Sequence, residues 1–215
     1  MAGLSRSRIV EAAIALLDEA GESGLTFRAL SAALKTGPGA IYWHVANKSE
    51  LLVAATEAVL EAVLEAPPGP GPEGPRGPEG AIRTLALGVF DAIDAHPWVG
   101  TQVARPESQP MALAIFERFG QQIQVIGAPI EAQFDAASAL LYYTLGVAGQ
   151  NAANARAQDP GTSRTDVLAG ASAELDPADF PFLHAVAGQL RDHDDRAQFL
   201  AGVDLILAGI RSSAR

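Results

Sequence analysis

The side chains best suited to chemistry lie within one stretch of the chain, TFRALSAALKTGPGAIYWHVANK. Tyr42, Trp43 and His44 offer an O–H group and ring N–H groups that can bind phosphates or the edges of bases. Arg28 can donate two parallel hydrogen bonds to a guanine. Lys48, at the expected start of a helix, suits a phosphate, and the helix dipole adds to that attraction. Together these residue types favour contact with nucleic acid.

Small residues precede these polar side chains. Residues 37–40, with the sequence Gly-Pro-Gly-Ala, would let the backbone come close to base edges in a major groove. Pro38 or Ala40 can also touch a thymine methyl group. The alternative for Tyr42 and Trp43 is burial in a hydrophobic core, because helix ends often pack an aromatic side chain.

Patterns typical of catalysis or metal binding are absent from the sequence. The four histidines show no HExxH or other close ligand spacing, and the chain has no cysteine; they are His44, His96, His184 and His193. The run His193-Asp194-Asp195 could bind a cation, but Asp194 equally suits the N-cap of a final helix. No GxSxG, P-loop or Rossmann fingerprint occurs. We therefore expect no catalytic residue, no metal site and no cofactor.

The charge of the chain is unevenly distributed. The net charge of −10 argues against a nucleic-acid partner, because phosphates are neutralised by Lys and Arg. Residues 1–50, however, carry five basic and five acidic residues, which leaves ten basic and twenty acidic residues for the remainder. A neutral head on an acidic body can still bind DNA locally.

Composition indicates a globular protein, with 48% hydrophobic and 19% charged residues. No signal peptide is evident. The longest uncharged apolar run, residues 136–149, is too short to span a bilayer. We expect a cytoplasmic protein with no membrane partner.

Helices must position the polar side chains, and hydrophobic spacing predicts three of them at the start of the chain. Apolar residues three and four apart predict a first helix over 4–20, with Ser5 as N-cap and Gly21 as stop. Thr26 would cap the second helix, and residues 35–37 form a turn. This is the pattern of a helix-turn-helix.

The third helix begins at Pro38, whose missing N–H group costs nothing in a first helical turn. Its buried side would be Ile41 and Val45. Asn47 and Glu50 resemble a capping box for a long fourth helix that ends near residue 65. Such a helix, rigidly joined to the DNA-reading head, can act as a lever.

The rest of the chain predicts an all-α protein, because no βαβ or hairpin pattern appears. Domains are expected at residues 1–47 (helix-turn-helix), 48–65 (connecting helix), 66–80 (Pro/Gly-rich linker) and 81–215 (helical effector-binding and dimerisation domain). Further helices are expected at 81–95, 98–103, 110–126, 130–156, 178–191 and 194–212, with a mobile loop over 159–176.

The stretch LTFRALSAALKTGPGAIYWHVANKSELL resembles the N-terminal domain of the tetracycline-repressor (TetR) family, and YWHV-x-NK resembles the tetracycline repressor's own subgroup. Residues 199–210, FLAGVDLILAGI, look like the last helix of that subgroup, and residues 143–147, YTLGV, look like its eighth helix. The resemblance covers nearly the whole chain. It implies an all-helical homodimer that docks two heads on a palindromic double-stranded DNA operator and binds a small-molecule inducer.

The same resemblance implies the residues of the DNA interface. Carried over to this sequence, they are Arg28, Pro38, Gly39, Ala40, Tyr42, Trp43, His44 and Lys48. The subgroup often has Gln-Pro-Thr where this chain has Pro38-Gly39-Ala40. Fewer side-chain hydrogen bonds there imply a different operator or greater reliance on apolar contacts and DNA shape.

The implied ligand pocket departs further from the subgroup, which binds a magnesium–drug complex through histidine and, by way of water, a carboxylate. Those positions here hold Leu64 and Gln150, and Ala86 replaces a polar amide. A largely apolar ligand with no required metal is therefore implied. The residues expected around it are Leu64, Ala86, Phe90, Trp98, Arg105, Phe116, Phe119, Tyr142 and Gln150. Periodicity alone leaves open that the aromatic residues belong only to the core.

The sequence thus predicts a transcriptional repressor that a ligand releases from its operator. Small residues on two expected helices are suited to a dimer interface: Ala136, Ala139, Gly146 and Ala153 on one, and Ala201, Ala208 and Gly209 on the other. Two alternatives stay open. One is a helical DNA-binding regulator without an effector, and the other is a ligand-binding protein or enzyme that does not bind DNA.

Overall fold

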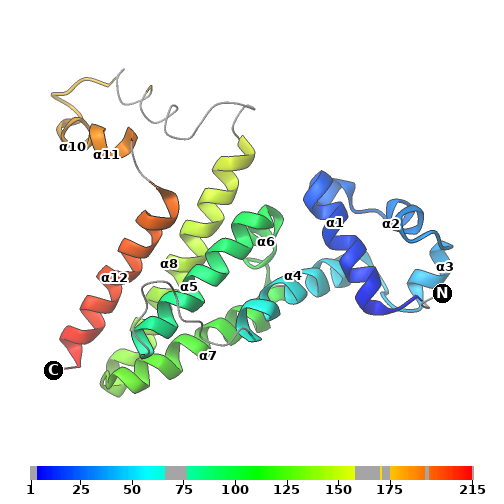
Figure 1. Ribbon diagram of the computed structural model, residues 1–215, viewed down its shortest axis with the longest axis horizontal. Coiled ribbons are helices and arrows are strands. Elements are labelled where there is room, and N and C mark those ends of the chain that lie inside the picture. The colour runs from blue at the N-terminus through cyan, green and yellow to red at the C-terminus, as the bar shows by residue number, and fades with distance from the viewer. Residues whose placement is uncertain (1–3, 66–76, 158–169, 171–174, 192–193, 215) are drawn as a thin grey trace.

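The computed structural model describes residues 4–65, 77–157, 170, 175–191 and 194–214. These residues form helices and no strand, so the expected all-α class is confirmed. The N-terminal head contains α1 (Arg6–Gly24), α2 (Phe27–Leu34) and α3 (Pro38–Tyr42), and α4 (Lys48–Glu65) runs from it into the body. Figure 1 shows the head set to one side of the body, with α4 between them.

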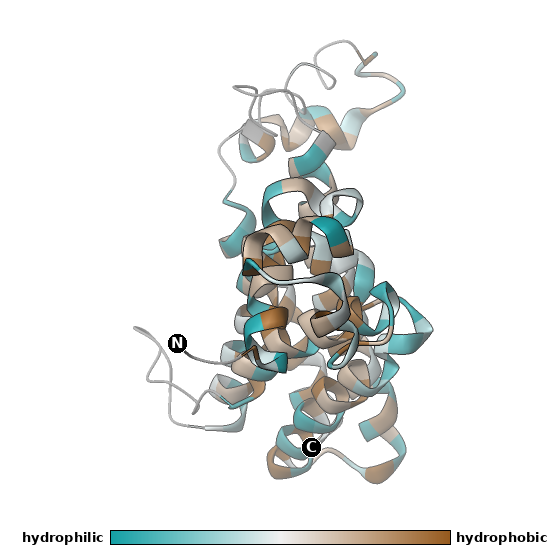
Figure 2. Ribbon diagram, turned by 90° about the vertical axis from the view of Figure 1, so that its right-hand side faces the viewer, coloured by the Kyte–Doolittle hydropathy of each residue, from teal (hydrophilic) through white to brown (hydrophobic). Residues whose placement is uncertain are grey.

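The body contains longer helices with hydrophobic and hydrophilic residues interspersed along each, as amphipathic helices have (Figure 2). The first five elements are α5 (Pro78–Ala95), α6 (Pro97–Gln102), the 3-10 helix η1 (Pro106–Ser108), α7 (Gln109–Ile126) and α8 (Ile130–Ala157). They are followed by α10 (Pro181–Ala185), α11 (Ala187–Arg191) and α12 (Asp195–Ser213). α8 is the centre of the body, where it packs against α5, α6, α7 and α12.

The helix starts follow the predicted caps. The side-chain oxygens of Ser5, Thr26, Asn47 and Asp194 accept backbone N–H groups three residues on, at 3.3, 3.1, 2.9 and 2.6 Å. Glu50 also reaches back, but its Oε2 accepts the N–H of Ala46 at 2.8 Å, one residue earlier than a standard capping box requires. Each cap satisfies N–H groups that a helix leaves unpaired.

The predicted stop at Gly21 is a kink within α1: Gly21 leaves the helical conformation, with a φ of 62°, and helical residues follow it up to Gly24. Two other predicted boundaries need correction. α5 begins at Pro78, inside the expected linker, since proline suits a first helical turn. The helix expected over 178–191 divides into α10 and α11. Residues 66–76, His193 and most of 159–176 lie outside the described residues.

Aromatic stacking fixes α12 on the body. The ring of Phe199 stacks on Phe90 of α5 and on Tyr143 of α8, with centroids 4.6 and 5.6 Å apart. The Tyr143 hydroxyl donates to the Phe199 carbonyl at 3.1 Å, and burial raises the pKa of Tyr143 above its usual value of 10.0. Gly202 is required beside this stack, because the Tyr143 ring and hydroxyl fill the place where any other residue would carry a Cβ.

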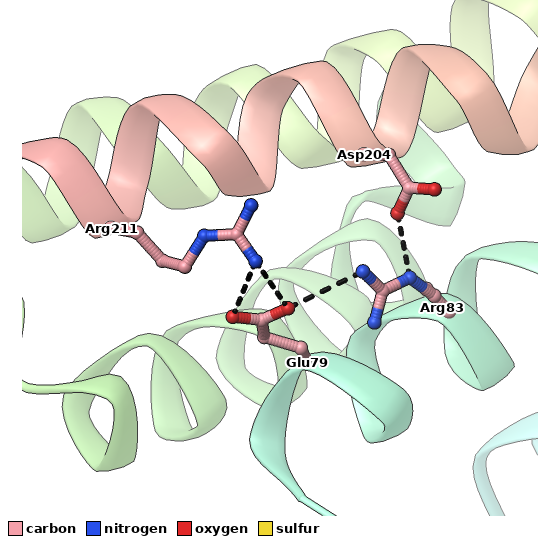
Figure 3. A network of polar contacts seen from close by, with 4 residues as sticks. All are labelled: Glu79, Arg83, Asp204 and Arg211. Carbon is pink, nitrogen blue, oxygen red and sulfur yellow. Dashed lines mark hydrogen bonds and ion pairs between the residues drawn. The ribbon is translucent and has the colours of Figure 1, made fainter. Parts of the chain in front are cut away.

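Ion pairs along one side of α12 add to this packing. Glu79 of α5 accepts from Arg211 of α12 at 3.0 Å and from Arg83 at 3.3 Å, and Arg83 in turn donates to Asp204 at 2.6 Å (Figure 3). Each of the two helices contributes one arginine and one carboxylate, and basic and acidic side chains alternate along the network. Each carboxylate in it therefore contacts an arginine. It fixes the start of α5 against the C-terminal half of α12.

Candidate DNA interface and ligand cavities

The turn between α2 and α3 positions the predicted DNA-binding residues. Lys35 adopts the left-handed conformation with a φ of 52°, and the N–H of Thr36 donates to the Ser31 carbonyl at 3.0 Å. Ile41 and Val45 are buried, as expected, and pack into the head core. Burial of such side chains stabilises the head by about 1.5–3 kcal/mol each, so the opposite face of α3 is held toward solvent.

That outward face carries two exposed aromatic side chains. Trp43 is 89% exposed and Tyr42 is 53% exposed. The Tyr42 ring stacks on Phe27 of α2, with centroids 4.4 Å apart and planes 13° apart. The alternative that Trp43 belongs to the core is therefore wrong. Tyr42 is held by Phe27 on one face only, which keeps its position while leaving its edge accessible.

The remaining predicted DNA-binding residues are also on the head. Arg28, Pro38 and Gly39 are exposed, whereas Ala40 and His44 are half-buried. No atom lies within 4 Å of the place a Cβ would occupy at Gly39, so this part of α3 is open to close approach.

Lys48 is engaged within the protein. Its ammonium group donates a hydrogen bond to the backbone carbonyl of Glu22, at the end of α1. A lysine ammonium has three donors, so this contact leaves two for another acceptor. The structure therefore assigns Lys48 a role in tying α4 to α1 that its position in the sequence did not indicate.

Two acidic residues of α1 join the head to the body, and the sequence did not single them out. Asp18 Oδ1 accepts from Trp98 Nε1 at 2.7 Å and lies 2.8 Å from His96 Nδ1. Glu22 Oε2 accepts from Gln102 at 3.0 Å and from Arg105 at 2.8 Å. These contacts span about 80 residues of sequence, so no local pattern could have revealed them.

The predicted ligand-binding residues are not gathered in one cavity. Ala86, Phe90, Trp98 and Phe119 are buried in the core, and Trp98 also borders a cavity of about 290 Å³ beside Asp18 and Glu22. Phe116 packs against Phe134 with ring centroids 5.9 Å apart. The expectation of a single aromatic-lined pocket is corrected accordingly, because the core takes up most of the aromatic side chains.

The other four residues line three separate cavities. Arg105 and Tyr142 lie in a cavity of about 610 Å³ between α6, η1, α7 and α8. Leu64 lines one of about 380 Å³ at the end of α4. Gln150 lines one of about 320 Å³ beside α12 and donates to Asn154 at 2.9 Å.

Within the described ranges, no three His, Cys, Asp or Glu side chains are grouped so as to hold a metal ion. None of the helices formed by these residues combines the length and the apolar character that a membrane span needs.

A helix-turn-helix head with an outward aromatic face, joined by one long helix to a body that contains cavities, defines the class of helical DNA-binding regulators. Two family descriptions match this chain. "Bacterial regulatory proteins, tetR family" matches residues 9–55, and "Tetracyclin repressor-like, C-terminal domain" matches residues 73–214. The chain belongs to the TetR family of transcriptional regulators.

Individual relatives agree with this assignment. Tetracycline repressor protein class G of Vibrio anguillarum is 31% identical, over 97% of this chain and 94% of its own. An HTH-type transcriptional regulator of Saccharopolyspora erythraea is 29% identical, over 98% and 86%. Among solved structures, the TetR regulator SCO7222 of Streptomyces coelicolor is 50% identical with a TM-score of 0.84, covering 99% of this chain and all of that one. ActR of the same organism, solved in complex with actinorhodin, is 26% identical with a TM-score of 0.72, over 99% of each chain.

Proposed function

We propose that the protein is a homodimeric repressor that binds a palindromic operator and leaves it when a small, largely apolar molecule binds the body. The observation that carries the proposal is Trp43, a large aromatic side chain that is 89% exposed directly after α3. Trp43 adjoins Tyr42, which is 53% exposed, so the two form a contiguous aromatic surface, and contiguous exposed apolar surface marks binding sites. In a helix-turn-helix, this face is the one that enters the major groove.

The roles on DNA follow from side-chain chemistry. Arg28 suits a bidentate contact with guanine, and the Tyr42 hydroxyl and His44 ring suit phosphates or base edges. The small residues 38–40 allow α3 to lie deep in the groove. Lys48 would share its ammonium between the Glu22 carbonyl and a phosphate.

The cavity of about 610 Å³ between α6, η1, α7 and α8 is the proposed effector site. Its volume falls within the usual range of about 300–1,000 Å³ for ligand pockets. Its walls are mostly apolar, and Arg105, Gln109 and Tyr142 supply a few polar groups. ActR, which shares the fold and was solved in complex with actinorhodin, is a precedent for an organic ligand of a protein with this fold.

Arg105 links this cavity to the head. It lines the cavity and also donates to Glu22 of α1 at 2.8 Å. A ligand that contacts Arg105 would change this ion pair, and with it the preferred orientation of the head. Release from the operator then depends on the ligand binding one orientation more tightly than the other.

Dimerisation would use the outward faces of α8 and α12. Ala139 and Gly146 on α8, and Ala201 and Ala208 on α12, are exposed small residues that allow helices to approach closely. Leu205 lies among them and is 76% exposed. A second copy that covers these faces would remove this apolar surface from water.

A mobility-shift assay on the DNA flanking the protein's own gene tests the proposal, repeated with a panel of apolar organic molecules. We expect a shifted band that at least one ligand abolishes. A band that no ligand affects would favour a regulator without an effector. Ligand binding without any DNA shift would favour a ligand-binding protein of another kind.

A further inference from the structure

A cavity of about 290 Å³ lies at the junction between the head and the body. Three helices line it, with Asp18 and Glu22 from α1, Trp98 and Gln102 from α6, and Arg156 from the end of α8. It shares no lining residue with the proposed effector site. The proposed function leaves this cavity without a role.

Three side-chain oxygen atoms of these lining residues accept no hydrogen bond from a described residue. Asp18 contacts the body through Oδ1 alone, which leaves Oδ2 unpaired, and Glu22 does so through Oε2 alone, which leaves Oε1 unpaired. Gln102 is only 3% exposed, and it donates to Glu22 through Nε2 while its own oxygen has no donor. Buried polar atoms normally have a hydrogen-bond partner, so the cavity lacks a donor group.

The basic side chain of the cavity is unpaired as well. Arg156 is exposed and forms no hydrogen bond or ion pair with a described residue. Leu17, Pro97 and the ring of Trp98 provide apolar walls between the two sets of polar groups. The cavity thus presents free acceptors on α1 and α6, a free cation on α8 and an apolar surface.

We propose that this cavity binds an α-amino acid with an apolar side chain. An ammonium group has three N–H donors, which match the unpaired oxygens of Asp18, Glu22 and Gln102. The carboxylate of the same ligand would pair with the guanidinium of Arg156. A simple amine or a simple acid would leave one of these two sets unpaired. The volume lies just below the range of about 300–1,000 Å³ for larger ligands, as so small a molecule requires.

Such a ligand would also hold the head in its present orientation. Asp18 and Glu22 belong to the head, whereas Gln102 and Arg156 belong to the body, so one molecule would contact both parts. Ligands stabilise the conformation to which they bind best. The amino acid would therefore oppose an effector that turns the head.

Calorimetric titration of the full chain with L-leucine tests the proposal without any DNA. Two matched counterparts are 4-methylpentanoate, which lacks the ammonium group, and 3-methylbutylamine, which lacks the carboxylate. We expect L-leucine to bind about tenfold more tightly than either, because each counterpart loses one charge-assisted contact.

Two variants separate the two ends of the ligand. Arg156→Gln should lower the affinity for L-leucine to that for 3-methylbutylamine and leave the affinity for the amine unchanged. Asp18→Asn keeps an oxygen for the Trp98 N–H but replaces the free Oδ2 with an NH₂ group, so it should weaken L-leucine and the amine but not 4-methylpentanoate. Arg196→Gln is the matched control, because Arg196 pairs with Asp91 and does not line this cavity.

Two further variants locate the probe. Thr101→Phe would fill the proposed site and should abolish L-leucine binding, with the melting temperature measured to confirm folding. Ala112→Phe would fill the proposed effector cavity instead and should leave L-leucine binding unchanged. The proposal is overturned if wild-type protein shows no saturable L-leucine binding, if either counterpart binds as tightly, if Arg156→Gln binds L-leucine as wild type does, or if Ala112→Phe abolishes that binding. None of these results depends on whether the protein represses transcription.

Discussion

Glu22 Oε2 of α1 lies 2.8 Å from Arg105 Nη2, and Arg105 also forms part of the wall of the proposed effector cavity. Gln102 of α6 donates to the same carboxylate oxygen at 3.0 Å. The head is thus joined to the cavity wall by an ion pair between Glu22, on the head, and Arg105, on the wall. This ion pair is a direct contact between α1 and the cavity wall, in addition to the packing of α4 against α6 and η1.

We expect Glu22→Gln to weaken the response to ligand while leaving ligand affinity intact, because Glu22 does not line the proposed effector cavity. The amide keeps its shape but loses the charge that attracts Arg105. The ratio of operator affinities without and with ligand should fall about fivefold, at the lower end of typical allosteric couplings. Fluorescence anisotropy with labelled operator measures this ratio.

Glu19→Gln is the control for that experiment, since Glu19 is an exposed acid on the same helix. It makes the same change in charge without touching Arg105. An equal loss of response in both variants would assign the effect to net charge and not to the ion pair.

Trp43→Ala should lower operator affinity at least tenfold, because one good side-chain contact with DNA contributes about 1–3 kcal/mol. The melting temperature should hardly change, since surface substitutions usually alter stability by about 0.5 kcal/mol or less. Phe182→Ala removes another well-exposed aromatic residue, on α10 away from the head, and should leave both quantities unchanged. If Trp43→Ala binds the operator as tightly as wild type does, Trp43 does not contribute to the DNA interface.

Gly202→Ala should destabilise the protein by about 1–3 kcal/mol, the usual effect of overpacking. The added methyl group would overlap the Tyr143 ring. Urea denaturation measures the loss, and Tyr143→Leu in the same chain should reduce it by freeing that space. Gly120→Ala on α7 provides the comparison: nothing lies within 4 Å of its Cβ position, so it should gain about 0.5–1 kcal/mol.

Leu205→Glu should convert the dimer to a monomer at micromolar concentration, because it would place two charges in an apolar contact between α12 and its partner. Sedimentation velocity measures the change. Leu113→Glu, on an exposed face of α7, should sediment as wild type does. A wild-type chain that is already monomeric would refute the dimer itself.

Local features of the fold were predictable from the sequence. Ser5, Thr26 and Asn47 each cap a helix by accepting a hydrogen bond from the backbone N–H three residues on, so both partners lie within four consecutive residues of the sequence. The burial of Ile41 and Val45 followed from the same helical spacing. The exposed face of α3 could be predicted because it lies opposite the buried side chains of Ile41 and Val45.

The cavities were beyond such reasoning. The family resemblance led us to expect Phe90 in the ligand pocket, yet it stacks on Phe199, which α12 brings from the far end of the chain. Whether an aromatic side chain borders a cavity or fills it depends on the neighbours that distant helices supply. The contacts of Asp18 and Glu22 were missed for the same reason.

The contacts between head and body also separate two properties that could be engineered independently. Asp18 and Glu22, which contact the body, are on α1, whereas Tyr42 and Trp43, which we propose face the DNA groove, lie at the end of α3 and directly after it. Replacing α2 and α3 with those of a relative would then redirect the protein to a new promoter while keeping its chemical trigger. Such a chimaera makes this chain a candidate part for synthetic gene circuits.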